Sequence, residues 1–407
     1  MTNRVVVTGY GVISAIGNTI DEFWESLKLG KTGIGPITYF DATRTGISVA
    51  AEVKDFPFNK YFEKKDGRRM DTFSLYAVHA ALDALEMSGI NEENTNYDRL
   101  GCIMASGIGG LEQSEKNGQV LLEKGPRKVT PLYVPLAIAN MATGNVALRT
   151  GARGVSRAEV TACAAGANSI GSAFREIKHG YADAMITGGA EAAICELGIA
   201  GFANLTALSK QTDSSIACRP FDKNRDGFVM GEGAGVLILE SLEHAEARGA
   251  TILAEIVGYG NTNDAYHMTS PSGVGAENAM KLALEEAGIS GEDIDYINAH
   301  GTSTQANEAS ESQAIHHIVG DKALVSSTKS FHGHALGATG SIEAIATILA
   351  MQHSFAPKNA GTKEVEEEMT INLVLGAGKD AEINYALSQD FGFGGHNAVL
   401  AFKKWKK

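Results

Sequence analysis

The sequence contains little cysteine, little proline and no long hydrophobic run. Four cysteines in 407 residues, without C-x-x-C spacing, make neither a disulfide framework nor a structural zinc motif. No apolar run approaches the roughly 18 residues of a membrane span, and the glycine-broken N-terminal stretch has no signal-peptide cleavage pattern. We therefore expect a soluble, cytoplasmic protein that does not bind membranes.

Positive charge is also in short supply. Lysine and arginine number 35 against 48 aspartates and glutamates, which gives a net charge of −13. Nucleic-acid binding needs a basic field, so this balance argues against a nucleic-acid partner and requires any anionic partner to meet a local basic patch. The hydrophobic fraction of 44% and the charged fraction of 20% are ordinary for a globular protein.

Glycine, by contrast, is abundant, with 47 residues, and it marks an internal repeat. An apolar strand at 4–8 runs into Gly-Tyr-Gly at 9–11, and a second one at 254–257 runs into Gly-Tyr-Gly at 258–260. The repeat predicts two related halves, residues 1–250 and 251–407, each alternating strands and helices in a largely parallel α/β arrangement. The expected strands are 159–162, 184–187 (closed by Gly188-Gly189), 295–299 and 324–326, and the expected helices surround 170–177, 279–287 and 342–349.

Cys163 is the best candidate for a nucleophile. It lies where the strand 159–162 meets the following helix, and a helix N-terminus stabilises a thiolate and offers free N–H groups to an oxyanion. The alternative is a small buried residue, the commoner fate of a cysteine. Cys102, Cys195 and Cys218 have no comparable setting and are interpreted as structural.

Two histidines follow predicted strands at glycine-rich turns. His300 lies in Asn298-Ala-His-Gly and His334 in Phe331-His-Gly-His, and parallel sheets place their sites at this carboxyl edge. For each one the alternative is a hydrogen-bonded core histidine. His332 and His334 also form an H-x-H pair that could bind zinc together with His300, which would indicate a metal-dependent hydrolase. No aspartate or glutamate flanks the pair as a further ligand.

Taken together, these motifs resemble the β-ketoacyl-[acyl-carrier-protein] synthases, most closely type II, of the thiolase superfamily. The resemblance covers essentially the whole chain. It is carried by Thr161-Ala-Cys163, Gly188-Gly-Ala-Glu191, Arg219-Pro-Phe-Asp222, Asn298-Ala-His-Gly-Thr-Ser-Thr304, Ser326-Ser-Thr-Lys329, Gly333-His334 and Phe391-Gly-Phe-Gly-Gly395, among others. It implies a thiolase-like αβαβα fold of five layers, built from two similar halves, and a homodimer.

The resemblance also implies roles for individual residues. Cys163 matches the acyl-accepting nucleophile, and His300 and His334 match the pair that promotes decarboxylation and stabilises the enolate. Lys329 and Glu343 match supporting residues, and Phe393 matches an aromatic gate whose amide completes the oxyanion hole. The implied substrate-binding residues are Thr302, Thr304, Thr269, Ser270, Phe391 and Glu343.

The implied reaction is a decarboxylative Claisen condensation of acyl- with malonyl-[acyl-carrier-protein] in fatty acid elongation. A cysteine thioester and neutral imidazole donors suffice for it, so we expect no metal and no cofactor beyond the phosphopantetheine that arrives on the carrier protein. A polyketide ketosynthase is the main alternative. A degradative thiolase would need a second cysteine near the C-terminus, and a chain-length factor would lack Cys163.

Some positions depart from the family pattern. Gln305 replaces a proline, His332 replaces a threonine, and Gln389-Asp390 replaces Asn-Ser before Phe391. An acidic side chain beside the gate could bias histidine protonation. These departures affect the expected rate and chain-length preference rather than the class of reaction.

A basic cluster in this acidic chain predicts where the carrier protein docks. Its residues are Lys64, Lys65, Arg68 and Arg69, with Arg127 and Lys128 from a neighbouring loop. Charge clusters of this kind attract acidic partners, although an ordinary solvated surface is the alternative.

Overall fold

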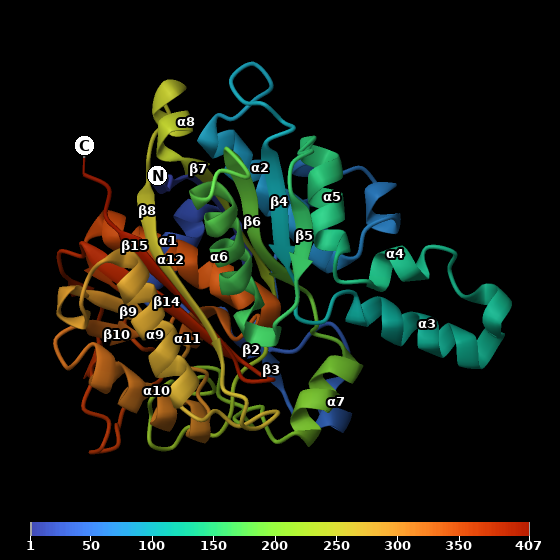
Figure 1. Cartoon of the computed structure of the whole chain (residues 1–407). Coiled ribbons are helices and arrows are strands. Elements are labelled where there is room, and N and C mark those ends of the chain that lie inside the picture. The colour runs from blue at the N-terminus through green and yellow to red at the C-terminus, as the bar shows by residue number, and fades with distance from the viewer. Residues whose placement is uncertain (1, 407) are drawn as a thin grey trace.

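The computed structural model describes residues 2–406, and a large mixed sheet forms its centre (Figure 1). The sheet has eleven strands. Their spatial order is β12 (Asn372–Leu373), β10 (Leu324–Ser326), β9 (Tyr296–Asn298), β14 (Tyr385–Gly392), β15 (His396–Lys403), β8 (Ala254–Asn263), β1 (Val5–Ser14), β7 (Gly233–Ser241), β6 (Ala184–Glu191), β4 (Leu100–Ala105) and β5 (Ser156–Glu159).

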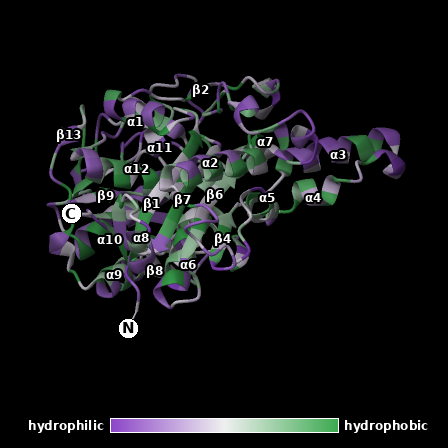
Figure 2. Cartoon of the chain, turned by 90° about the horizontal axis from the view of Figure 1, so that it is seen from above, coloured by the Kyte–Doolittle hydropathy of each residue, from purple (hydrophilic) through white to green (hydrophobic). Residues whose placement is uncertain are grey.

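The two halves of this sheet lie on either side of an inner pair of helices, and further helices cover their outer faces, which gives five layers. On the outside, α2 (Thr72–Ser88) packs on β1 and β7, while α9 (Val274–Ala287) packs on β8 and β15, flanked by α10 (Gln305–Ile318). Between the two halves lie α6 (Ala165–Lys178) and α12 (Thr339–His353), which contact each other and strands of both halves. Figure 2 shows the apolar residues concentrated in these inner layers. The expected thiolase-like αβαβα fold is confirmed.

The repeated Gly-Tyr-Gly has a packing explanation. A Cβ at Gly9 or Gly258 would clash with the backbone of the outer helix, α2 or α9 respectively. The tyrosines point to the inner layer, where Tyr10 donates to Gln352 of α12 at 2.7 Å and Tyr259 donates to Asn168 of α6 at 2.6 Å. Each repeat therefore joins an outer helix to an inner one.

The two inner helices approach closely near their N-terminal ends. A Cβ at Gly166 would lie 2.8 Å from Ser341 N, and one at Gly340 would lie 2.5 Å from Ala167 N. Only glycine allows this contact, because any side chain would separate the helices. The contact brings the start of α6, from the first half, against the start of α12, from the second.

The remaining elements lie around this core. They are α1 (Ile20–Leu29), α5 (Met141–Thr150), α7 (Glu196–Asn204), α8 (Leu242–Ala247), α11 (Lys329–His332) and the small pairs β2 (Gly35–Pro36) with β3 (Val49–Ala50) and β11 (Phe355–Ala356) with β13 (Lys379–Asp380). An arm formed by α3 (Leu111–Lys124) and α4 (Tyr133–Ala137) projects from the body (Figure 1). Within residues 2–406 no helix has the length and apolarity needed to cross a membrane.

Several sequence predictions needed correction. The sheet is not largely parallel, because the pairings from β14 through to β6 are all antiparallel and only the outer ones are parallel. A tight glycine turn at 393–395 makes β14 and β15 a hairpin, which needs no crossover helix. The division at residue 250 stays a prediction, since one continuous sheet joins the halves.

Two strand ends were also misplaced. The strand before Cys163 ends at Glu159, and Ala162–Ala164 form a short 3-10 turn instead. Gly188 and Gly189 do not close β6 but lie inside it, where a Cβ would clash with Gly235 and Gly337 of the neighbouring backbone. The predicted helices 170–177, 279–287 and 342–349 are confirmed within α6, α9 and α12.

Candidate active site

A cavity of about 420 Å³ opens between the two halves and collects most of the predicted site residues. Cys163, His300 and His334 all line it. The other predicted residues on its wall are Thr269, Ser270, Thr302, Thr304, Phe391 and Phe393. Lys329 and Glu343 do not line the cavity and lie buried next to it.

Cys163 is held just before α6, in the 3-10 turn Ala162–Ala164, by an unusual backbone. The preceding Ala162 has a φ of +51°, a conformation that costs a non-glycine residue on the order of 1–3 kcal/mol. Thr161 is fixed by a hydrogen bond of 2.7 Å from Asn168 Nδ2, and Asn168 itself accepts from Tyr259 at 2.6 Å. The strained turn is therefore anchored to the repeated tyrosine of the second half.

Cys163 does not rest as a thiolate, contrary to the stabilisation that the helix N-terminus suggested. Burial raises the pKa of the Cys163 thiol to about 12, and Lys329 only partly offsets this effect. The thiol is therefore neutral at physiological pH, and it must lose its proton as it attacks a substrate.

His300 follows β9 and is held through its backbone. The N–H groups of His300 and Gly301 donate to the two carboxylate oxygens of Glu311 at 2.6 and 2.8 Å. The His300 ring lies edge-on to the His334 ring, with centroids 5.5 Å apart, and 5.6 Å from the ring of Phe391.

His334 follows α11 and is fixed by its ring. Its Nδ1 lies 2.9 Å from the hydroxyl of Thr339, at the start of α12, and its backbone N–H donates to Val229 at 2.7 Å. The Nδ1 contact leaves Nε2 as the ring nitrogen for the cavity.

Both histidines are neutral. Burial, followed by the charge of Lys329, holds the pKa of His300 and of His334 well below the usual range. A neutral imidazole donates one hydrogen bond and accepts one, so each ring can stabilise an oxyanion without carrying a charge.

His332 takes no part in this group. Its Nδ1 contacts the carbonyl of Gly333 at 2.8 Å and its Nε2 contacts the hydroxyl of Thr328 at 3.0 Å. Because both ring nitrogens are used, His332 offers no lone pair to a metal shared with His334. The zinc interpretation of the H-x-H pair therefore loses one of its three ligands.

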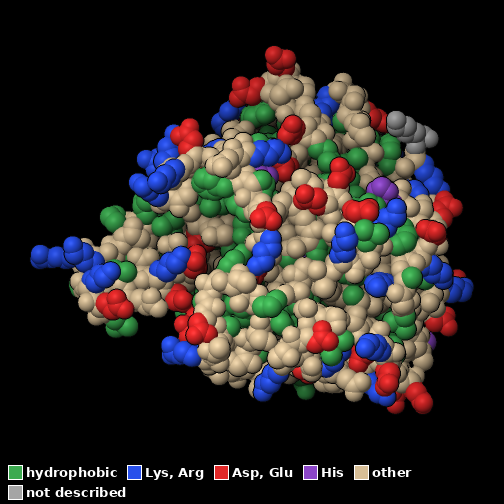
Figure 3. All heavy atoms as spheres, turned by 180° about the vertical axis from the view of Figure 1, so that it is seen from behind, with side chains coloured by type: hydrophobic (Ala, Val, Ile, Leu, Met, Phe, Trp, Pro, Cys, Tyr) green, Lys and Arg blue, Asp and Glu red, His purple; other side chains and the backbone are tan. Residues whose placement is uncertain are grey.

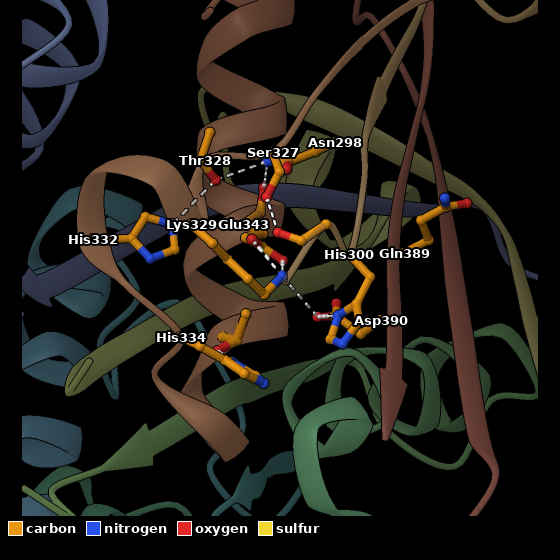
Figure 4. Close-up of polar contacts among 12 residues, drawn as sticks. Asn298, His300, Ser327, Thr328, Lys329, His332, His334, Glu343, Gln389 and Asp390 are labelled. Atoms are coloured by element: carbon orange, nitrogen blue, oxygen red, sulfur yellow. Dashed lines mark hydrogen bonds and ion pairs between the residues drawn. The ribbon is translucent and has the colours of Figure 1, made fainter. Parts of the chain in front are cut away.

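A buried charge cluster lies behind the histidines (Figure 4). Lys329 Nζ is 2.8 Å from each carboxylate oxygen of Glu343 and 4.0 Å from Asp390 Oδ1, and all three side chains are fully buried. Burial disfavours the charge of Lys329, but Glu343 and Asp390 outweigh it and raise the pKa of Lys329. This fixed cation keeps the nearby imidazoles neutral.

The glycine loop passes directly over the nucleophile. A Cβ at Gly392 would lie 3.1 Å from Cys163 N, so this loop and the start of α6 are in close contact. Gly394 and Gly395 have φ values of +87° and +75°, which favour glycine. The ring of Phe393, which lies between Gly392 and Gly394, has its centroid 6.5 Å from that of Phe202.

The remaining predicted residues lie nearer the cavity entrance. The hydroxyls of Thr302 and Thr304 are 2.9 Å apart, and the backbone N–H groups of Thr269 and Ser270 donate to His267 at 3.1 and 3.2 Å. Gln305 also lines the cavity. It begins α10 and donates to the carbonyl of Arg225 at 2.6 Å.

The predicted docking cations are all exposed, but they fall into two groups. Lys64, Lys65, Arg68 and Arg69 lie on the body around the 3-10 turn Asp66–Arg68, whereas Arg127 and Lys128 lie in the turn that follows α3. Figure 3 shows cationic side chains at the tip of the arm and, separately, on the body.

Sequence reasoning missed several supporting residues. Glu191, buried in β6, accepts the backbone N–H groups of Gly107 at 2.6 Å and Gly337 at 2.9 Å, so it ties the loop after β4 to the turn after His334. Thr339, Glu311 and Asn168 likewise hold His334, His300 and Thr161 through hydrogen bonds between separate segments of the chain. Nothing in the sequence indicates these pairings, because each joins residues from different elements.

The comparisons with known proteins agree with this geometry. Residues 2–245 match the family "Beta-ketoacyl synthase, N-terminal domain" and residues 253–363 match "Beta-ketoacyl synthase, C-terminal domain". The chain is 48% identical to the 3-oxoacyl-[acyl-carrier-protein] synthase 2 of Staphylococcus aureus (strain N315) over 408 aligned positions, 99% of each chain.

Solved structures are similar over the full length. A β-ketoacyl synthase from Burkholderia phymatum STM815 superposes with a TM-score of 0.93 at 36% identity, covering 99% of this chain and all of the other. A type II polyketide ketosynthase, solved in complex with its acyl-carrier protein, gives 0.92 at 31% identity with complete coverage of both chains. The chain therefore belongs to the β-ketoacyl synthase family.

Proposed function

We propose that this protein condenses an acyl group with a malonyl group, each carried on an acyl carrier protein, and releases CO2 during fatty acid elongation. The observation that carries the proposal is one cavity lined by a cysteine and two neutral histidines. The 48% identity to a 3-oxoacyl-[acyl-carrier-protein] synthase 2 supports the same substrates.

In the first half-reaction, Cys163 Sγ attacks the acyl thioester and the carrier thiol leaves with a proton. Because the pKa of Cys163 is raised by burial, the thiol proton passes to a base, and a neutral imidazole of the cavity can accept it. The amides of Cys163 and Phe393 stabilise the oxyanion, in line with the close contact between their loops.

In the second half-reaction, the bond between the malonyl carboxylate and the α-carbon breaks. CO2 leaves, and the electron pair forms an enolate whose oxygen accepts hydrogen bonds from His300 and His334. The α-carbon then attacks the thioester on Cys163 and the thiolate leaves. Each bond change uses only substrates and side chains, so the proposed chemistry needs no metal and no redox cofactor.

The other residues position these reactants. Lys329 keeps the histidines neutral, as its effect on their pKa values supports, and Glu343 holds Lys329 in place through two hydrogen bonds. Thr302 and Thr304 bind the pantetheine, with Thr269 and Ser270 at the entrance, a role consistent with the polar hydroxyls on the cavity wall. Phe393 gates the acyl pocket, beside Phe391, and Gly394 supplies the flexibility.

The carrier protein docks on the exposed cations named above, because an acidic partner is attracted to the basic patches of an otherwise acidic surface.

We also assign a homodimer. The arm exposes Leu121, Leu122 and Val134, and β5 at the sheet edge is followed by exposed Val160, an apolar surface that a second copy would cover.

A polyketide ketosynthase is the second candidate, supported by the solved polyketide ketosynthase at 31% identity. An assay with acyl-carrier-protein thioesters of graded length separates the two. Elongation of saturated acyl chains by one two-carbon unit per malonyl group supports the proposal, while preference for a poly-β-keto chain favours the alternative. Absence of CO2 release and of any condensed product would overturn both.

A further inference from the structure

Asp390 is a fully buried carboxyl group without a hydrogen-bond partner in the part of the chain that the structure describes. It lies within the buried part of β14, and neither of its side-chain oxygens is hydrogen-bonded within the described residues. His300 Nδ1 is also without a partner there, and it lies 3.4 Å from Asp390 Oδ1 (Figure 4). A buried carboxyl group is costly unless it is paired, so these two unpaired groups call for a common explanation.

The surrounding charges do not provide that explanation. Lys329, from α11, is already bound by both oxygens of Glu343, from α12, and lies 4.0 Å from Asp390. Glu311, from α10, faces His300 but accepts the N–H groups of His300 and Gly301.

The two remaining titratable groups that face the pair are also accounted for. His334 uses Nδ1 on Thr339, and burial keeps it neutral. Cys163 is protonated at rest because burial raises its pKa. One buried lysine thus faces two buried carboxyl groups, and the site can balance its charge by holding one extra proton.

We propose that Asp390 is a positioning residue for His300, and that the two side chains share one proton between Asp390 Oδ1 and His300 Nδ1. This inference rests on the proposed function of His300 as an enolate donor. The position of the shared proton determines whether Nδ1 or Nε2 of His300 carries the ring hydrogen, and therefore whether Nε2 can donate a hydrogen bond into the cavity.

The proton count gives the direction of the effect. When Asp390 is protonated, its O–H donates to Nδ1, so the imidazole hydrogen is on Nε2, where it can donate to the enolate oxygen. When Asp390 is ionised, its carboxylate draws the imidazole hydrogen to Nδ1. Nε2 then presents a lone pair to the cavity and repels the developing enolate.

The titration behaviour of the two groups agrees with this geometry. Burial raises the pKa of Asp390 to about 6, against the opposing charge of Lys329, while the pKa of His300 stays far below its usual value. In the working pH range the proton is therefore gained or lost by a carboxyl group rather than by His300, and of the two buried carboxyl groups, whose pKa values are both raised by burial, Asp390 is the one that lies against His300 Nδ1. Decarboxylation should slow as the pH rises through the pKa of Asp390.

The test is the pH profile of CO2 release from malonyl-carrier protein, measured in a Cys163→Ala parent so that the thiol does not titrate. We expect the parent rate to fall by about tenfold per pH unit above its apparent pKa. Asp390→Asn keeps an N–H donor on Nδ1 at every pH, so its rate should change less than about twofold across the same range. Ser388→Ala, a buried change on the same strand, should keep the parent profile.

Labelled histidine NMR gives a second measurement that does not depend on turnover. The His300 ring hydrogen should move from Nε2 to Nδ1 as the pH rises in the parent and stay on Nε2 in Asp390→Asn. The inference would be overturned if the rate of CO2 release in Asp390→Asn still fell with rising pH, or if the His300 tautomer in the parent did not change with pH. A parent that releases no CO2 at any pH would instead contradict the proposed function.

Discussion

Removing Lys329 should destabilise the protein more than removing either of its acidic neighbours. Lys329→Met leaves Glu343 and Asp390 buried without a cation, whereas Glu343→Gln leaves Lys329 with Asp390 still 4.0 Å from Nζ. All three side chains are fully buried, so solvent screens none of these interactions. The structure therefore predicts an asymmetry between the two variants.

The expected magnitudes follow from these contacts. Breaking a buried pair and leaving a bare charge costs about 3–5 kcal/mol, so Lys329→Met should lose this much free energy of unfolding. Glu343→Gln replaces the carboxylate partner of Lys329 with a neutral amide and should lose about 1.5–3 kcal/mol. The surface pair of Lys281, which is exposed, and Glu277, which is half-buried, provides the control, since Lys281→Met should lose less than ~0.5 kcal/mol.

The pH dependence of Lys329→Met has a definite sign. Without the cation, burial raises the pKa values of both carboxyl groups above those of the unfolded chain, so the folded state binds more protons. The stability deficit should therefore shrink as the pH falls from 8 towards 5. Urea unfolding of wild type and variants across this range measures it. A larger loss in Glu343→Gln than in Lys329→Met, or a deficit that grows on acidification, would refute the reasoning.

Three further changes test the rest of the site. Reversing Arg68 and Arg69 to glutamate should raise the KM for carrier-bound substrates and flatten its salt dependence, as steady-state kinetics at two ionic strengths would show. Gly394→Val, at a φ of +87°, should slow condensation while circular dichroism shows a folded protein. Thr339→Val removes the hydroxyl on His334 Nδ1 and should slow CO2 release by about tenfold, or ~1.4 kcal/mol.

Each of these has a matched control and a contradicting result. The paired reversals Lys322→Glu and Lys379→Glu change the net charge by the same amount as the Arg68 and Arg69 reversals, but in the second half of the chain, and should leave KM unchanged. If KM is also unchanged in the Arg68 and Arg69 variant, the docking proposal is wrong. Thr347→Val removes a buried hydroxyl of the same helix α12, which bonds only to a backbone carbonyl. Equal slowing in Thr347→Val and Thr339→Val would show that His334 is not held through Thr339. Full activity of Gly394→Val on long acyl chains would contradict the gate.

The sequence predicted the family, the fold class and several of the residues that line the cavity, because motifs that are short and local carry the family resemblance. The repeated Gly-Tyr-Gly could be read as two halves, and its cause, glycines under outer helices and tyrosines on inner ones, appears only in three dimensions. Cys163 and His300 were found from their positions at the ends of strands and the starts of helices.

Long-range pairing and burial were beyond the sequence. The antiparallel centre of the sheet depends on which strands become neighbours, and the neutral Cys163 thiol depends on burial that a helix-start argument ignores. Thr339 and Glu311 hold the histidines through contacts between separate elements. Asp390 was noticed as an unusual residue, but only its position beside His300 gives it a role.

The central claim is that Cys163 accepts the acyl group while His300 and His334 drive decarboxylation. The most direct test follows radiolabelled CO2 release and the intact mass of the protein in parallel for Cys163→Ala and His334→Ala. Cys163→Ala should form no acyl adduct and no condensed product, yet still release CO2 from malonyl-carrier protein. His334→Ala should form the adduct on Cys163 but lose roughly a hundredfold in CO2 release, about 3 kcal/mol. Stoichiometric acylation of Cys163→Ala, or an undiminished rate of CO2 release in His334→Ala, would contradict this account.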